Sequence, residues 1–492
     1  MKKSIQNILA ELASPFRCVK GLNKPLLVVF ICLNSLVVLN ACLHDPFVGY
    51  DVGEHLKYIE TFGKMHLPTV TETAEFYSPP LPYALPALVV AAGAKDLWWP
   101  AKIGQLFNAL LSIGLTFYLL KICDFFDFAN PHLKTATLLF LGLLPVYYKS
   151  FAFVRGEPFV AFFAVFIIYQ ALQIFVSRRW IWPNTIMLGV ALGLVVLSRQ
   201  WGFFLFPPLI FWIMWVAFRE ANARLWCVKI VLVVLTISFL VGGWFYLRMP
   251  NHRGAVTNFN RQPAPRFAIS NQPAGFYFGL GAAKLFTDPL RPAFPNQLLP
   301  ILYSEIWGDY WQYFVVSGCD LRTGAAISGG KLEELTAQGP APEWFVTNRF
   351  QISSYLGRVN LISLFPTALA LAAICFGVFR CLRYLRLVEN TDPAKGVVLV
   401  ILYLAVSLAG YLWFLIMYPN PEKGDTIKAT YLLQIFPFIA LLVGILLQAI
   451  REKKRLVYQI IMLLLVVVWL HNLPAMLSHY LSQPGLRKLL LG

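Results

Sequence analysis

Residues 41–81, ACLHDPFVGYDVGEHLKYIETFGKMHLPTVTETAEFYSPPL, are the stretch around which we interpret the fold. The stretch follows the first long apolar run, and ionisable side chains crowd its first part although only 13% of all residues are charged. Charged groups beside a membrane span are costly to keep unless they have a use. We therefore interpret the stretch as the first outer loop of a membrane protein. The ionisable residues are Asp45, Asp51, Glu54 and His55.

The composition is that of a membrane protein. Of the 492 residues, 58% are hydrophobic, whereas a soluble domain has about 45–50% apolar residues. The formal net charge of +17 would favour nucleic-acid binding in a soluble protein. Here the basic residues lie in short loops between apolar runs, so membrane orientation explains them better and we expect no nucleic-acid partner. The eight cysteines show no CxxC motif and no disulfide spacing, which argues against a disulfide framework or a zinc site.

The basic loops also predict how the chain is threaded. Residues 1–24 are rich in Lys and Arg, which places the N-terminus in the cytoplasm. The apolar run 80–94 contains several prolines and is short for a span, which needs about 20 residues. If it crossed the membrane, the basic loops 177–179 and 451–455 would face outward. We therefore expect it to lie along the membrane or to re-enter, within a first outer loop of residues 43–100.

This threading predicts an all-α polytopic membrane protein with about eleven transmembrane helices. It also predicts juxtamembrane helices in the first outer loop and a small extracytoplasmic domain. The parts are an N-terminal transmembrane module (1–248), an extracytoplasmic loop domain (249–355) and a C-terminal transmembrane module (356–492). The outer segments contain no Asn-x-Ser/Thr sequon, which favours a bacterial inner membrane over the alternative, the endoplasmic reticulum.

Asp51 is the strongest catalytic candidate in the first outer loop. Asp51 and His55 are four residues apart, so they would share one face of a helix. Such a carboxylate could deprotonate an incoming hydroxyl, and the histidine could orient it. The alternative is a solvated loop in which Asp51 caps a surface helix. A metal site from Asp45, Asp51, Glu54 and His55 is a weaker alternative, because the spacing fits no standard motif.

Later outer loops hold further candidates. Arg155 and Glu157 form either half of a polar site or an ordinary helix start. Arg199 is either a headgroup anchor or a phosphate contact. Lys428 breaks the positive-inside pattern, which slightly favours an anionic ligand over snorkelling. The outer segment contains SEIWGDYWQYF (304–314), which is dense in aromatic residues.

Taken together, these motifs resemble the GT-C superfamily of glycosyltransferases, which includes protein O-mannosyltransferases and the lipid A aminoarabinose transferase. The resemblance rests on an acidic first outer loop, a proline-rich entry to a juxtamembrane helix, an acid before a proline, and a late span with a proline. These motifs are found here at Asp51, Ser78–Leu81, Glu157-Pro158 and Thr430–Leu433 with Pro437.

The chain departs from the family pattern in each of its first, second and last motifs. Val52 follows Asp51 where a second acid is common, so Glu54 is the candidate for that role. Ser78 stands where histidine is common. Thr430 stands where arginine is common, which makes Lys428 the substitute contact for a phosphate.

The resemblance implies inverting transfer of a sugar from a polyprenyl-phosphate donor to an acceptor hydroxyl of a glycan, lipid or protein on the outer face. It implies a catalytic group, a set that contacts the donor phosphate, and further substrate-site candidates. No metal or cofactor is firmly implied, although a divalent metal is an open alternative. In that order the residues are Asp51 as general base with Glu54 and His55; Lys428, Arg199, Arg155 and Tyr431; and Glu157, Ser78, Trp307 and Asp309.

The main rival interpretation is a transporter or flippase for a lipid-linked saccharide. Transporters favour charged residues or broken helices near the middle of the bilayer, often with internal repeats. Here the charges cluster at one face and no repeat is evident, which favours an enzyme. A third interpretation is a multispan assembly subunit in which Asp51 would be dispensable.

Overall fold

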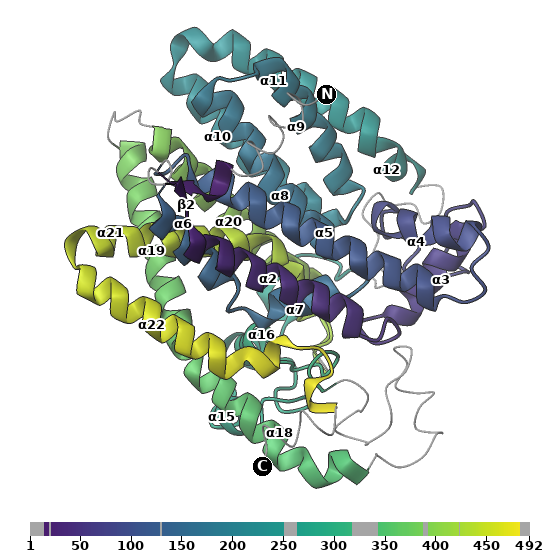
Figure 1. Ribbon diagram of the computed structural model, residues 1–492. Coiled ribbons are helices and arrows are strands. Elements are labelled where there is room, and N and C mark those ends of the chain that lie inside the picture. The colour runs from purple at the N-terminus through teal and green to yellow at the C-terminus, as the bar shows by residue number, and fades with distance from the viewer. Residues whose placement is uncertain are drawn as a thin grey trace.

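The computed structural model describes residues 14–18, 21–127, 130–249, 263–316, 343–386, 392–422 and 424–482. The regular secondary structure of these residues is helical, apart from a short antiparallel pairing of β1 (Arg17–Cys18) with β2 (Gly21–Leu22) (Figure 1). The α-helices are α2 (Lys24–Leu43), α3 (Val52–Gly63), α4 (Leu81–Ala91), α5 (Trp98–Cys123), α6 (Pro131–Leu141), α7 (Pro145–Ala152), α8 (Glu157–Leu172), α9 (Ile181–Val196), α10 (Phe206–Arg219), α11 (Arg224–Ser238), α12 (Trp244–Arg248), α14 (Ala274–Phe278), α15 (Lys284–Thr287), α16 (Leu298–Trp307), α18 (Glu343–Ile362), α19 (Leu364–Arg386), α20 (Asp392–Met417), α21 (Phe436–Lys453) and α22 (Arg455–Asn472).

The apolar helices confirm an all-α polytopic membrane fold. Within the described ranges, 9 helices are long and apolar enough to cross a membrane. The pair α6 and α7, bent by 67°, raises the number to 10 if it forms one span. Helix α9 has 16 residues and counts only as a shorter apolar helix. The predicted number of about eleven spans therefore stays a prediction.

Proline sets the start of several spans. α8, α10 and α21 each carry a proline in their first turn. A proline there lacks only an N–H group that the helix would leave unpaired anyway, and its fixed φ suits the helix. Pro158 thus lies in the first turn of the helix that begins just after Arg155, whereas Pro437 lies in the first turn of α21, which follows the 3₁₀ helix after Lys428.

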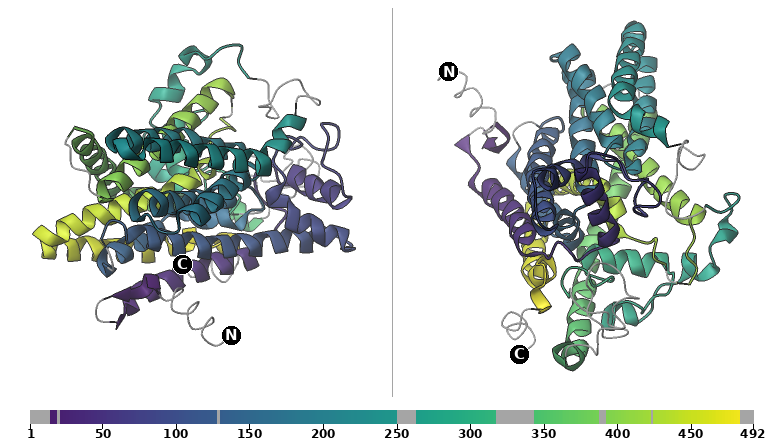
Figure 2. Two further views of the ribbon diagram at one scale, coloured as in Figure 1. Left: turned by 90° about the horizontal axis from the view of Figure 1, so that it is seen from above. Right: turned by 90° about the vertical axis from the view of Figure 1, so that its right-hand side faces the viewer.

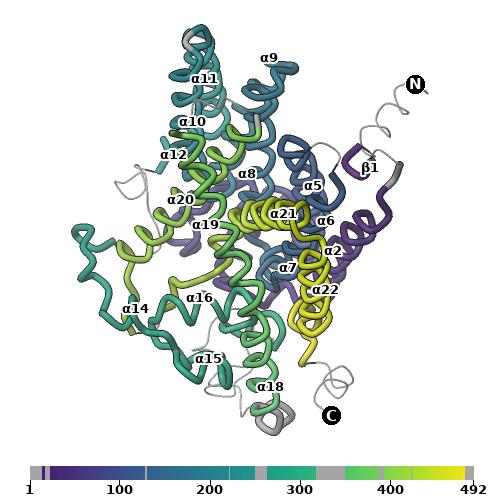
Figure 3. The backbone as a smooth tube through the Cα atoms, turned by 90° about the vertical axis from the view of Figure 1, so that its left-hand side faces the viewer, coloured from purple at the N-terminus to yellow at the C-terminus, as the bar shows by residue number. Residues whose placement is uncertain are grey.

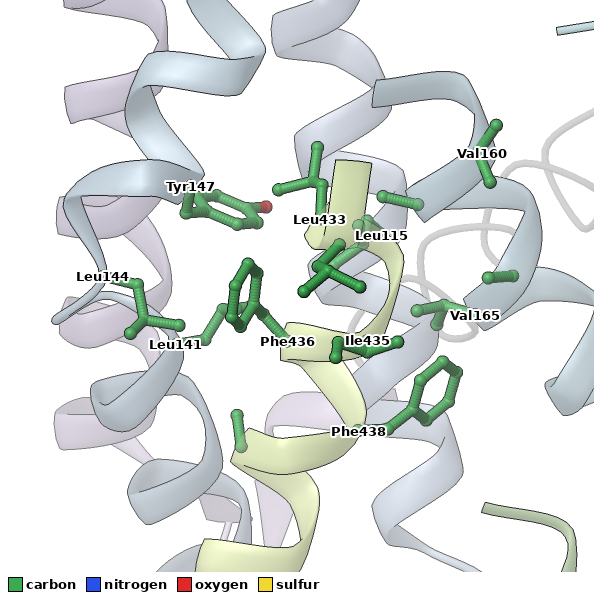
Figure 4. Close-up of a cluster of buried hydrophobic side chains, with 14 of the residues drawn as sticks. Leu115, Leu141, Leu144, Tyr147, Val160, Val165, Leu433, Ile435, Phe436 and Phe438 are labelled. Atoms are coloured by element: carbon green, nitrogen blue, oxygen red, sulfur yellow. The ribbon is translucent and has the colours of Figure 1, made fainter. Parts of the chain in front are cut away.

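The span Ala429–Lys453 is the centre of the bundle, since 78% of its apolar window is buried, against 22% for Arg455–Met476. Its first part, Ala429–Ile435, is a 3₁₀ helix that continues directly into α21. Figure 4 shows its Leu433 and Phe436 among side chains from neighbouring helices, including Tyr147 and Leu115. A helix that is apolar all round can face lipid or the interior of a bundle, and the buried fraction of this one places it in the interior. This enclosure fixes the position of Lys428, which immediately precedes the span.

Helices α3 and α4 pack together in the first outer loop (Figure 1). α4 has 11 residues, which gives it a length of about 17 Å, well short of a membrane span. Its length agrees with the juxtamembrane helix predicted for residues 80–94. In the left view of Figure 2, the purple and blue segments of this loop lie at one end of the long helices.

The described part of the predicted outer domain contains α14, α15, α16 and the first part of α18. Figure 3 shows these elements grouped on one side of the molecule. α18 continues through residue 355 to Ile362, and the candidate span begins at Phe350. The predicted boundary between residues 355 and 356 therefore falls inside a helix.

The basic loops lie at the other end of the same helices. At the far ends of α8 and α10, Arg178 pairs with Glu220, which also pairs with Lys395 at 2.9 Å. Lys134, in the first part of α6, lies 2.8 Å from Asp124. The basic loops thus lie at one end of the bundle, and the acidic first loop lies at the other end.

Candidate functional site

Asp51 immediately precedes α3 and has left-handed backbone geometry, with φ of 53°. Its main-chain carbonyl accepts hydrogen bonds from the N–H groups of Glu54 and His55, at 3.1 and 3.2 Å. Its side chain makes no capping bond to the helix. Instead, its Oδ2 accepts a hydrogen bond of 2.7 Å from Lys428 Nζ. The carboxylate is 41% exposed, so it can meet a ligand from outside.

Two cations surround the Asp51 carboxylate. Besides Lys428, Arg155 Nη1 lies 3.9 Å from the same oxygen. Burial disfavours the charged form of Asp51, but Lys428 and then Arg155 outweigh it and hold the pKa of Asp51 well below its usual range. The ring of Tyr431 lies 5.7 Å from the Arg155 guanidinium and 5.9 Å from Lys428 Nζ, so it supports both cations.

A chain of buried charges continues behind Arg155. Arg155 Nε donates to Glu157 at 3.2 Å, and Arg199 Nε donates to the other oxygen of Glu157 at 3.3 Å. Arg199 Nη1 then donates to Glu75 at 3.1 Å and also to Ser78 Oγ, which itself bonds Glu75. Alternating signs let these groups stay ionised although they are buried, because each charge has a partner.

A close backbone approach brings these segments together. A Cβ atom placed on Gly156 would collide with the main-chain carbonyl of Ser198. Only glycine therefore lets the loop that carries Arg155 and Glu157 pack directly on the loop that carries Arg199. The packing of the site thus requires a glycine at position 156.

His55 lies beside this chain of charges and is buried. Its Nδ1 shares a hydrogen bond of 2.7 Å with the Tyr83 hydroxyl and is 3.9 Å from Glu75. Burial is the main cause that lowers the pKa of His55 to about 4, although Glu75 opposes the shift. Its Nε2 has no hydrogen-bond partner among the described residues. His55 is therefore a neutral imidazole near neutral pH, and its Nε2 is buried.

The remaining predicted residues do not all join the site. Glu54 is turned toward residues 73–74, where its carboxylate accepts hydrogen bonds from Ala74 N at 2.7 Å and Thr73 Oγ1 at 3.0 Å. Asp309 accepts main-chain N–H bonds from residues 314 and 315 at 2.9 and 2.7 Å, which makes it an organiser of its own loop. Trp307 is buried at the end of α16. None of these contacts involves Asp51.

Sequence reasoning missed Glu75 and Lys149. Glu75 lies directly before the Phe-Tyr-Ser-Pro-Pro run, and an acid next to an apolar juxtamembrane segment could have been noted as a candidate partner for Arg199. Lys149 lies in a predicted span, where an ionisable residue signals function or a buried partner. Its partner is Glu305, at 2.6 Å.

The residues around Asp51 do not fit a divalent metal. Within the part of the chain that the structure describes, no group of 3 or more His, Cys, Asp or Glu side chains could hold one. The four residues of the alternative metal set turn apart, since Asp45 caps the N–H of Phe47 and Glu54 binds the residue 73–74 turn. The charges nearest Asp51 are cations, which repel a metal ion.

Comparison with solved structures finds matches for this architecture. The archaeal oligosaccharyltransferase AglB from Archaeoglobus fulgidus, solved with an inhibitory peptide and a dolichol-phosphate, is 12% identical with a TM-score of 0.51; the match covers 92% of this chain and 56% of that one. An Archaeoglobus fulgidus oligosaccharyltransferase solved with Zn and sulfate gives 12% identity and a TM-score of 0.49, with coverage of 92% and 53%. ArnT from Cupriavidus metallidurans bound to undecaprenyl phosphate gives 13% and 0.37, with coverage of 87% and 80%.

The likeness to the first of these structures concerns the fold. The fold of the chain is similar to that of this oligosaccharyltransferase. The chain spans 56% of the length of that oligosaccharyltransferase. No protein-family model and no curated protein matches the chain.

Proposed function

We propose that this protein transfers a glycosyl group from a polyprenyl-phosphate sugar to an acceptor hydroxyl, with Asp51 as the general base. The observation that carries the proposal is the Asp51 carboxylate, which is exposed and ionised between two buried cations in a GT-C-type fold. An anionic donor phosphate fits the cations, and a hydroxyl fits the carboxylate. The dolichol-phosphate bound to AglB supports a polyprenyl-phosphate carrier as the class of donor.

The reaction is a displacement at the anomeric carbon. The acceptor oxygen forms a bond to that carbon, and its proton passes to the Asp51 carboxylate. The bond between the anomeric carbon and the phosphate oxygen breaks, and its electron pair leaves with the polyprenyl phosphate. Attack from the face opposite the leaving group inverts the configuration.

Lys428 and Arg155 have a separate task in this proposal. The leaving phosphate gains negative charge as its bond to the sugar breaks, and preorganised cations stabilise that charge. Both side chains are buried and supported by the Tyr431 ring, so they need little reorganisation when the donor binds. No step of the proposal passes through a metal, because the nearest charged groups around Asp51 repel one.

We further propose that the Asp51 end of the bundle faces away from the cytoplasm. The basic loops at the opposite end support this orientation through the positive-inside rule. It places the N-terminus in the cytoplasm, and a bacterial inner membrane is the membrane that we favour. Acceptor and donor would then meet at the outer surface.

The test is sugar transfer by the Asp51→Asn variant, assayed with a synthetic radiolabelled polyprenyl-phosphate sugar in proteoliposomes with membrane extract as acceptor source. Loss of a general base lowers kcat by about 100- to 10,000-fold, and we expect a loss in that range with unchanged folding. Asp45→Asn is the matched control, since Asp45 is another acid of the same loop, and its carboxylate accepts a hydrogen bond from the N–H of Phe47. Undiminished transfer by Asp51→Asn would refute the general-base role.

A further inference from the structure

A second buried polar cluster joins the residue before Asp51 to the outer segment. The Tyr50 hydroxyl donates a hydrogen bond of 2.5 Å to Glu305 Oε2, and Lys149 Nζ donates to the same oxygen at 2.6 Å. The side chains of Lys149 and Glu305 are completely buried. Tyr50 comes from the first outer loop, Lys149 from α7 and Glu305 from α16. Segments far apart in the sequence therefore meet at one carboxylate oxygen.

The Glu305 carboxylate is held from several directions. Its other oxygen accepts a hydrogen bond of 3.0 Å from the main-chain N–H of Trp311. Lys149 also donates to the main-chain carbonyls of Glu305 at 3.2 Å and Gly308 at 3.4 Å, and it lies 3.8 Å from Asp309. Tyr50 thus bonds to an acceptor that cannot move without breaking a buried ion pair, which is costly.

Tyr50 in turn touches both cations that face Asp51. Its main-chain carbonyl accepts a hydrogen bond of 3.2 Å from Arg155 Nη1. Its ring lies 5.5 Å from the Arg155 guanidinium and 5.0 Å from Lys428 Nζ. The next residue, Asp51, has a left-handed backbone, a geometry that aspartate adopts more readily than most residues with a Cβ atom. The orientation of Tyr50 therefore also sets where the Asp51 backbone turns into α3.

We propose that Tyr50 and Glu305 are positioning residues that hold the Asp51 carboxylate against Lys428 and Arg155 in its reactive geometry. The hydroxyl bond to Glu305 fixes Tyr50, and Tyr50 in turn fixes the start of the Asp51 backbone and the positions of the two cations. This inference rests on the proposed function, since it takes Asp51 as the general base. A misplacement of about 1 Å at a reacting group can cost about 100-fold in rate, so a rigid anchor matters.

The variant Tyr50→Phe tests the inference because it removes only the hydroxyl and keeps the ring beside the cations. We expect kcat to fall about tenfold while the donor KM stays within about twofold, since the groups that meet the phosphate remain. The control is Tyr310→Phe, another buried tyrosine of the outer segment, whose hydroxyl donates to the Phe294 carbonyl at 3.3 Å. It should keep the wild-type kcat.

A pH profile separates positioning from general stability. If Asp51 moves away from Lys428 and Arg155, its pKa rises, and the acidic limb of kcat/KM moves to higher pH. The other titratable groups that influence or adjoin Asp51 are His55 and Glu75, and Tyr50→Phe leaves their hydrogen bonds intact. A fold defect alone would lower the amount of active enzyme without moving this limb.

The variant Glu305→Gln gives a second measurement through a double-mutant cycle. If Tyr50 and Glu305 act as a unit, the double variant loses no more kcat than the more impaired single variant. Wild-type kcat and an unmoved acidic limb in Tyr50→Phe would overturn the positioning role, whether or not Glu305→Gln folds. If this result came with an inactive Asp51→Asn, only the positioning role would fail. An active Asp51→Asn would instead overturn the proposed function.

Discussion

Replacing Lys428 by methionine removes the ammonium group next to Asp51 and keeps an unbranched side chain. The two charges are 2.7 Å apart, a distance at which a unit pair is worth about 1.5 kcal/mol in water. Since 41% of the Asp51 side chain is exposed, solvent screens the pair and this aqueous figure is the appropriate scale. We therefore expect the pKa of Asp51 to rise by about one pH unit in Lys428→Met.

The direction of the pH effect follows from the role of the ionised carboxylate. Lys428 and Arg155 hold the pKa of Asp51 below its usual range, so the wild type keeps its base ionised at pH values where an ordinary aspartate begins to protonate. Activity is lost as the pH falls through the pKa of the native enzyme. Because Lys428→Met raises that pKa, its loss of activity occurs at higher pH.

The assay is kcat/KM for transfer from a synthetic polyprenyl-phosphate sugar from pH 7 down to about pH 2, since the wild-type limb lies below the usual aspartate range and kcat/KM reports groups of the free enzyme. The variant should also lose about 100-fold in kcat, because a cation that stabilises the leaving phosphate is gone. Lys395→Met is the matched control, since its ion pair of 2.9 Å with Glu220 lies at the opposite end of the bundle. An unmoved acidic limb in Lys428→Met, or an equal movement in the control, would refute the reasoning.

Glu54→Gln should keep kcat within about twofold of the wild type, because the Glu54 carboxylate binds the turn at Ala74. The hydrogen bonds of such a partly exposed group are worth about 1 kcal/mol or less. A loss of kcat as large as that of Asp51→Asn in the same transfer assay would contradict this. In the wild type, the acidic limb of kcat should lie at higher pH than that of kcat/KM. The reason is that a bound donor phosphate shares Lys428 and Arg155 and so releases part of their hold on Asp51. Coincident limbs in one pH series would exclude this sharing.

The end of the bundle that carries the site could be predicted because its signals, apolar runs and basic loops, are visible in the order of residues along the chain. Apolar runs and basic loops fix which connections lie on one side, whatever the lateral order of the helices. Asp51, Arg155 and Lys428 were assigned to one side in this way. The structure brings the Arg155 and Lys428 side chains within ion-pair distance of Asp51, although residues 51 and 428 are 377 positions apart.

The pairing of individual side chains could not be predicted in the same way. Hydropathy contains no information on which helix is the central one, so nothing in the sequence indicated that Lys149 of α7 would face Glu305 of α16. The sequence also did not indicate which acid of the first loop joins the buried charges. Glu54 is closer to Asp51 in sequence, yet it is Glu75 that pairs with Arg199, because the loop folds back. Such contacts depend on packing of the outer loops.

The charge pattern of the site indicates how a donor could activate its own base. The buried members are each held by a partner of opposite sign, and Arg199 is fixed between two carboxylates, so it is better suited to support Arg155 through Glu157 than to meet a phosphate. Only the pair at the exposed end can yield to an added anion. A phosphate that binds Lys428 would weaken its bond to Asp51, and the carboxylate would become a stronger base when the donor is in place. The alternating set consists of Lys428, Asp51, Arg155, Glu157, Arg199 and Glu75. The positive and negative charges of this set balance before the donor binds. A bound phosphate adds a further anion, which competes with Asp51 for Lys428.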